Sequence, residues 1–118
     1  MRLNHLALTV ADRQRSIAFY ATYFGFDPST ARRYADGVVI IRGAEGFALA
    51  LGEDRSVERA VGFPHFGFDP GSAEEVRRLR DRLVADGFEL VEVEDTDTYV
   101  GFKCLDPDRH VIEVSRET

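Results

Sequence analysis

Two histidines and one glutamate stand where the strand pattern of the sequence could bring them to one metal ion. His5 lies in an alternating segment over 3–10, His65 in a similar segment over 63–69, and Glu113 in a third apolar segment over 110–115. Side chains alternate between the two faces of a strand, and each of these residues falls on the face opposite its large apolar neighbours. Two imidazoles and one carboxylate suit Fe(II), Mn(II), Zn(II), Ni(II) or Co(II), and leave coordination positions open for water and substrate.

Each of the three residues also has a plainer interpretation. A single strand histidine is more often a structural, hydrogen-bonded residue than a ligand, and Glu113 could be a solvated strand residue. A histidine that recurs at the same point of two similar segments, together with a carboxylate of matching parity, favours a metal site. A cation would also stabilise a buried carboxylate that is otherwise costly to leave unpaired.

The elements predicted around these residues form an internal repeat, in which the second half of the chain has the same order of elements as the first. The first strand is followed by a helix that Asp12 caps and that Gly25 ends in the left-handed C′ position. The second is followed by a helix that Ser72 caps in a Ser-x-x-Glu capping box and that Gly87 ends. Three strands are expected after the first helix, over 30–34, 38–42 and 47–51. Three more are expected after the second helix, over 89–94, 99–104 and 110–115. The fold class is therefore α+β, with βαβββ modules at about 1–52 and 61–118 of a single domain, 1–118.

Composition narrows the classes of function. The chain has 118 residues and a net charge of −6, which argues against a nucleic-acid surface. A single cysteine, Cys104, rules out an internal disulfide and fits a reducing compartment. No apolar stretch is long enough to span a membrane or to act as an export signal. We therefore expect a cytoplasmic protein that binds neither nucleic acid nor membrane.

Three segments carry a resemblance to a known family. LNHLALTVADRQRSIAFYATYFGF, FPHFGFD and YVGFKCLDPDRHVIEV resemble the vicinal oxygen chelate superfamily. That superfamily includes glyoxalase I, extradiol dioxygenases, methylmalonyl-CoA epimerase, fosfomycin-resistance thiol transferases and bleomycin-binding resistance proteins. The resemblance implies two modules that form a U-shaped, partly open mixed β-sheet barrel with helices outside. It also implies one divalent metal held by His5, His65 and Glu113, and a homodimer, in which some members draw the ligands of one site from two chains.

Departures from the family pattern narrow the expected activity. Glyoxalase I and the epimerase use a fourth ligand on the fourth strand, where aligning 47–51 with 110–114 places Ala50. Three ligands are closer to the dioxygenases and to the thiol transferases, which the opening segment resembles most. The transferases, however, carry Lys and Ser in a loop that here reads as the acidic segment 92–98, and a Tyr near the position of Lys103. An acidic loop is poorly suited to a phosphonate anion, so fosfomycin itself is not the expected substrate.

Four further side chains are candidates for the site. Lys103, the only lysine, and Tyr99 are expected with Glu113 among the catalytic groups, and Thr9 and Tyr34 are expected to contact substrate. The plainer alternatives are an exposed edge-strand lysine and ordinary sheet tyrosines. Two functions remain open. One is a metal-dependent enzyme of dioxygenase or glutathione/thiol-transferase type acting on a small oxygen-rich molecule. The other is a bleomycin-resistance-type protein that sequesters a drug or natural product.

Overall fold

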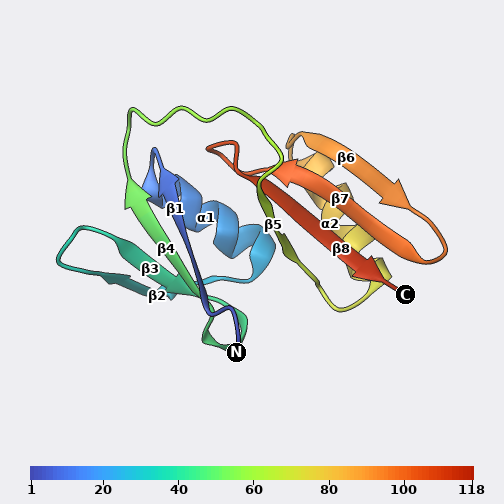
Figure 1. Cartoon of the computed structure of the whole chain (residues 1–118), viewed down its shortest axis with the longest axis horizontal. Helices are drawn as coiled ribbons and strands as arrows, with labels where there is room; N and C mark the ends of the chain where they lie inside the picture. The colour runs from blue at the N-terminus through green and yellow to red at the C-terminus, as the bar shows by residue number, and fades with distance from the viewer. The chain divides into compact units, whose positions relative to one another are not determined.

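The computed structural model describes all residues, 1–118, and the chain divides into two compact units, Met1–Glu58 and Arg59–Thr118. Both units have the element order βαβββ, as Figure 1 shows. The first contains β1 (His5–Val10), α1 (Arg13–Phe24), β2 (Asp27–Arg33), β3 (Val39–Arg42) and β4 (Ala48–Glu53). The second contains β5 (His65–Phe68), α2 (Ala73–Ala85), β6 (Leu90–Asp95), β7 (Tyr99–Leu105) and β8 (Val111–Glu117). The predicted α+β class with two similar modules is confirmed.

Each unit has one four-stranded mixed sheet, and neither sheet is closed into a barrel. The strand orders are β1-β4-β3-β2 and β5-β8-β7-β6. The first and last strands of each unit pair in parallel, and the other pairs are antiparallel. β4 and β8, the last strand of each unit, are therefore interior strands with a neighbour on both sides.

Helix α1 begins and ends at the predicted residues. The Asp12 side chain accepts a hydrogen bond from the Arg15 backbone N–H, and Gly25 has φ 72°, in the left-handed region. Ile17, Phe19 and Tyr20 are buried, and the helix packs against β2 and β4. An apolar helix face is thus stabilised by covering one face of the first sheet, which leaves the other face to the side chains of opposite parity.

Helix α2 follows the same plan in the second unit. Ser72 caps it by accepting from the Glu75 backbone N–H, and Gly87, two residues after the helix, has φ 88°. Val76 and Leu83 are fully buried, and the helix packs against β7 and β8. Neither helix of the chain has the length and apolar character required to cross a bilayer.

The arginine-rich face of α2 makes ion pairs both within the helix and with its sheet. Arg78 does pair with Glu74 and Glu75 on its own helix. Arg77 and Arg80 instead pair with Asp95 at the end of β6. The Arg77 guanidinium binds the Asp95 carboxylate in a bidentate manner, with N–O distances of 2.9 and 2.8 Å. These guanidinium groups lower the pKa of Asp95 to about 2. The contact therefore ties the helix to the edge strand of its sheet.

The segment between β3 and β4 is more ordered than a simple loop. It holds a short 3-10 helix, Ala44–Gly46, in which Glu45 has φ 56°.

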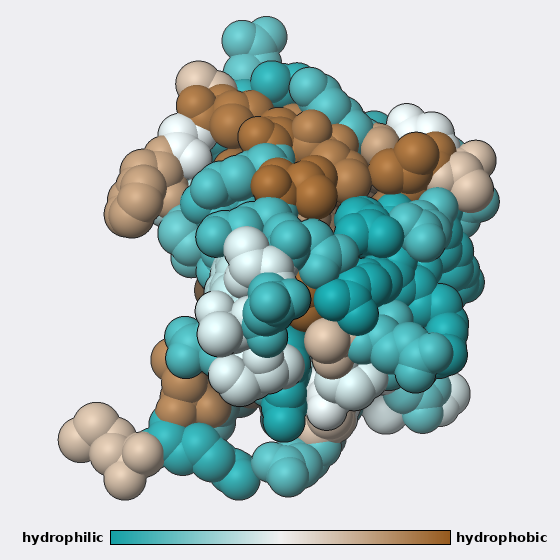
Figure 2. Space-filling model, turned by 90° about the vertical axis from the view of Figure 1, so that its right-hand side faces the viewer, coloured by the Kyte–Doolittle hydropathy of each residue, from teal (hydrophilic) through white to brown (hydrophobic).

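Figure 2 shows a face of the molecule on which hydrophilic side chains predominate and hydrophobic ones form separate patches. Large exposed apolar side chains include Leu3, Phe63, Val84 and Val93.

Candidate metal-binding site

The strand register of the second unit places several candidate residues on one face of its sheet. Glu113 on β8 lies opposite Gly67 on β5 and opposite Lys103 on β7. Cross-strand partners point to the same face, and His65 and Tyr99 share it by strand parity. Buried Phe102, Ile112 and Val114 have the opposite parity and belong to the core under α2. The predicted division of the two faces is confirmed.

His65 has one ring nitrogen fixed and the other available. Its Nδ1 lies 2.7 Å from the carbonyl oxygen of Phe63. Because a carbonyl oxygen only accepts, Nδ1 carries the proton, and Nε2 of the neutral ring presents a lone pair. Nε2 lies 3.8 Å from Glu113 Oε2. A metal bonds to His nitrogen and carboxylate oxygen at about 2.1 Å each, so two donors up to about 4.2 Å apart can share one ion.

Glu113 has a second partner on its other oxygen. The Tyr99 hydroxyl donates to Glu113 Oε1 at 3.2 Å. Burial, more than any other cause, raises the pKa of Tyr99, and the neighbouring Glu113 carboxylate raises it further. The phenol is therefore a neutral donor at physiological pH. The two oxygens of Glu113 thus have different surroundings, one facing a phenol and the other facing an imidazole.

Lys103 lies on the same face but is engaged by another carboxylate. Its Nζ is 2.8 Å from Glu92 Oε2 on β6, and this contact raises the pKa of the lysine. Glu94 lies two cross-strand pairs further along β6 and lines the same small hollow as Tyr99 and Glu113. Because β7 is an interior strand, Lys103 is not an edge-strand lysine, which was the plainer alternative for this residue. Its charge is neutralised locally, and it stays protonated.

His5 has the same kind of arrangement in the first unit. Its Nδ1 lies 2.7 Å from Asn4 Oδ1, which leaves Nε2 as the free donor atom when the amide oxygen accepts. Thr9 shares its face, and Ala50 is the residue on β4 that corresponds to Glu113. Alanine offers no donor atom, so this face of the first sheet carries only the histidine among metal-binding side chains of β1 and β4.

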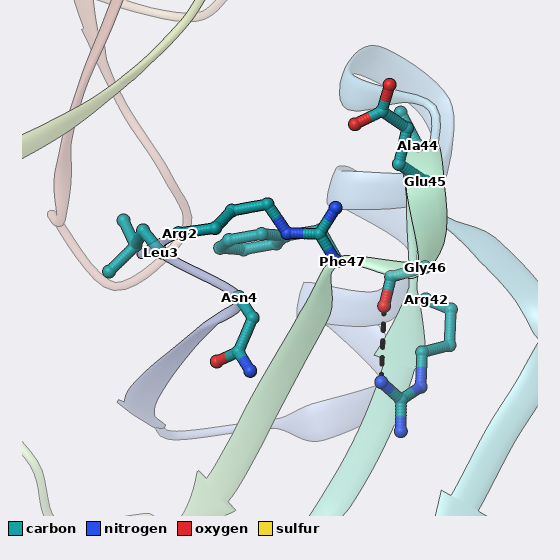
Figure 3. A pocket seen from close by; sticks show the side chains of 8 residues that line it. All are labelled: Arg2, Leu3, Asn4, Arg42, Ala44, Glu45, Gly46 and Phe47. Carbon is teal, nitrogen blue, oxygen red and sulfur yellow. Dashed lines mark hydrogen bonds between the residues drawn. The ribbon is translucent and has the colours of Figure 1, made fainter.

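A hollow of about 200 Å³ adjoins the start of β1 and is drawn in Figure 3. It is lined by Arg2, Leu3, Asn4, Arg42, Ala44, Glu45, Gly46 and Phe47. Arg42 spans the turn by donating to the Gly46 carbonyl at 3.1 Å. The hydrogen-bond partner of His5, Asn4, is therefore part of a hollow edged by two guanidinium groups.

The structure places Glu113 close to both His65 and Tyr99, and places Lys103 on the same face. His5 and Thr9 belong to the first unit, and no group of three or more His, Cys, Asp or Glu side chains is gathered at one point. Tyr34 lies at the turn after β2, is 40% exposed, and has the Arg32 guanidinium 5.6 Å from its ring centre. The donor set of the second unit fits a divalent cation, since it offers one lone-pair nitrogen and one free carboxylate oxygen.

Sequence reasoning missed two residues of this face. Glu92 falls in the predicted strand over 89–94 and in the acidic segment 92–98, but it was not singled out as the partner of Lys103. Gly101 was not singled out, although an ideal Cβ there would lie 2.5 Å from the Tyr99 hydroxyl oxygen. A glycine inside a strand, two residues after a tyrosine, was the available signal, because glycine there often marks a close approach.

Two other reactive residue types are structural. Cys104 is fully buried, and burial raises the pKa of its thiol to about 12, so the thiolate is absent at neutral pH. His110 is buried at the turn between β7 and β8, where its Nδ1 lies 2.8 Å from Asp106 Oδ2. Both residues are therefore part of the buried structure of the second unit.

Comparisons with known proteins agree with this fold. The family model described as the Glyoxalase/Bleomycin resistance protein/Dioxygenase superfamily matches residues 2–114. The chain belongs to this family, the vicinal oxygen chelate superfamily that its motifs resemble. A search of curated protein sequences gave no significant match.

Solved structures show the same fold over nearly the whole chain. A possible glyoxalase from Bacillus cereus is 30% identical, with a TM-score of 0.77 and 97% of each chain covered. The fosfomycin resistance protein FosX from Listeria monocytogenes, complexed with Mn(II) and sulfate, is 22% identical, with a TM-score of 0.80 over 99% of this chain and 90% of that one. A glyoxalase/dioxygenase from Nostoc punctiforme is 20% identical, with a TM-score of 0.78 over 99% and 91%.

Proposed function

We propose that this protein is a divalent-metal-dependent enzyme whose ion is held by His5, His65 and Glu113. The observation that carries the proposal is the 3.8 Å separation of His65 Nε2 and Glu113 Oε2. In the tautomer that donates from Nδ1 to Phe63, Nε2 and Oε2 both offer lone pairs, and a shared cation would satisfy both. His5 supplies the third donor, since its Nε2 is free and its Nδ1 is already bonded to Asn4.

A bound divalent ion would act as a Lewis acid that stabilises negative charge developing on substrate oxygens. The protein's own groups would orient the substrate and move protons around it. Tyr99 and Glu113 are proposed as the nearest polar groups, and Lys103 as a fixed positive charge balanced by Glu92. Thr9 and Tyr34, on the first unit, are proposed as substrate contacts.

The charges on the second unit's face bear on the substrate. Glu92, Glu94 and Glu113 line one hollow, and the only cationic side chain lining it, Lys103, is already paired. Such a surface is unfavourable for a phosphonate anion and favours a neutral, oxygen-rich small molecule. We therefore favour a dioxygenase-like or glutathione/thiol-transferase-like reaction over modification of fosfomycin. Mn(II), which the Listeria protein binds, is one candidate metal.

The alternative function is sequestration of a drug or natural product, as in bleomycin resistance. A protein that only binds has no need of three metal-donor side chains.

The proposal also includes a cytoplasmic homodimer that completes its site between subunits, because small members of this family commonly do so. A single monomeric species in light scattering would contradict the dimer without touching the metal site.

Metal content decides between enzyme and binder. Untagged protein is expected to retain or take up about one divalent ion per chain, measured by mass spectrometry of the metal after desalting. His65→Ala and Glu113→Ala are expected to lose that ion, and His5→Ala to weaken its binding. Glu89→Ala, an exposed residue just before β6, serves as the control and is expected to keep it. A wild type that stays metal-free yet binds an aromatic ligand would overturn the enzyme proposal.

A further inference from the structure

The ring of Tyr99 lies along β7 and covers Gly101. An ideal Cβ at Gly101 would lie 2.5, 2.8 and 2.9 Å from the Tyr99 Oη, Cζ and Cε1 atoms. Real Cβ atoms do not approach heavy atoms this closely, so any side chain at this position would displace the ring. Gly101 does not have a left-handed backbone conformation. The requirement for glycine here is therefore the space that the tyrosine ring occupies.

This placement lets the Tyr99 hydroxyl reach diagonally to the next strand. Tyr99 itself lies opposite Glu117, and Lys103 is the residue opposite Glu113. With its ring flat over Gly101, however, Tyr99 spans the distance to Glu113 and donates to Oε1. Ser115, on β8 opposite Gly101, lowers the pKa of the phenol, against the larger effect of burial. The bond to Glu113 on β8 thus fixes the position of the phenol oxygen.

The bond to Tyr99 makes the two oxygens of Glu113 inequivalent. Oε1 is occupied by the phenol, and Oε2 is the oxygen 3.8 Å from His65 Nε2. Gly67, opposite Glu113 on β5, adds no side chain beside the carboxylate, and a Cβ there would meet the Glu113 carbonyl oxygen at 3.2 Å. The carboxylate orientation is therefore set from the side of β7, by Tyr99.

We propose that Tyr99, seated on Gly101, is a positioning residue that limits Glu113 to a single metal-bound oxygen, Oε2. The inference rests on the proposed function, because it concerns the same metal. If Glu113 bound a six-coordinate ion through one oxygen, one more coordination position would stay open than if it bound through both oxygens. The positions open to substrate would thus be set partly by a residue that does not touch the metal.

The test compares Tyr99→Phe and Gly101→Ala with the wild type. Tyr99→Phe keeps the ring and removes the donor, and Gly101→Ala keeps the hydroxyl and displaces the ring. Loss of a hydrogen bond to a metal ligand weakens binding by about 10- to 100-fold. We expect both variants to bind Mn(II) at least about tenfold more weakly. We also expect both to change the Co(II) absorption spectrum in the same direction, since that spectrum depends on coordination geometry.

Gly52→Ala is the matched control, because a Cβ at this strand glycine meets only the Leu8 carbonyl oxygen at 3.9 Å. It is expected to bind Mn(II) with wild-type affinity and to give the wild-type Co(II) spectrum. If Gly101→Ala does not fold, Tyr99→Phe decides the case alone. Wild-type affinity and spectrum in Tyr99→Phe, with metal lost in His65→Ala, would overturn the positioning role and leave the proposed function standing. A wild type that binds neither ion would overturn both.

Discussion

Ala50 and Glu113 occupy the same register position in the two units. Ala50 on β4 pairs with Ala7 on β1, and Glu113 on β8 pairs with Gly67 on β5. The predicted alignment of the segment 47–51 with 110–114 is thereby confirmed. The repeated unit thus presents a carboxylate on one copy and a methyl group on the other, which is why the expected ligand set has three members rather than four.

Restoring a carboxylate at this position should strengthen metal binding. Ala50→Glu is expected to raise Mn(II) affinity by about tenfold, equivalent to about 1.4 kcal/mol. Without metal, the added charge should lower the melting temperature, because it stands on a partly buried sheet face. With metal, the increase in melting temperature should exceed that of the wild type, since a ligand that binds only the folded state stabilises it. Calorimetry and titration with Mn(II) measure both effects.

The control for this prediction is Ala44→Glu, which adds the same charge at an exposed turn residue outside the strands. An equal gain in Mn(II) affinity in both variants would show a general charge effect and contradict the equivalence of Ala50 with Glu113.

The contact of Asp95 with α2 should appear in the pH dependence of stability. The pKa of Asp95 in the folded protein is about 2, below its ordinary value of 3.8. A carboxyl with a lowered folded pKa stabilises the protein above its unfolded pKa, and this contribution is lost as the pH falls toward the folded value. Asp95→Asn should therefore melt below the wild type by a constant margin above about pH 5. That margin should shrink between pH 3.8 and about 2.

Asp97→Asn, in the turn after β6, is the control for Asp95, and its melting temperature should stay close to that of the wild type. A gap between Asp95→Asn and the wild type that persists unchanged down to pH 2 would mean that the ion pair is not its cause.

Neighbouring residues of α2 should differ sharply in their effect on stability. Leu83 is fully buried against the sheet, whereas Val84 is 55% exposed. Leu83→Ala should lower the free energy of unfolding by about 2–5 kcal/mol, because it removes buried methyl groups and leaves a cavity. Val84→Ala should change it by less than about 0.5 kcal/mol. Urea denaturation followed by circular dichroism measures both, and similar losses would contradict the orientation of the helix.

Local patterns in the sequence were sufficient to predict the elements and their faces. Asp12, Gly25 and Ser72 act at the helix ends where their chemistry predicts, since capping depends on neighbours within a few residues. Strand parity correctly separated the core from the face that carries His65 and Glu113. Both depend on local periodicity, which a single sequence contains.

The partners of the site residues were decided by tertiary structure. Tyr99 bonds to Glu113 rather than to its cross-strand neighbour, and Lys103 pairs with Glu92. These contacts depend on the register between strands and on the free space above Gly101, and strand periodicity alone fixes neither. The sequence by itself thus determined which residue types stand on the site face. The folded sheet determined which oxygen of Glu113 is free, because only there do a phenol and an imidazole approach it from different strands.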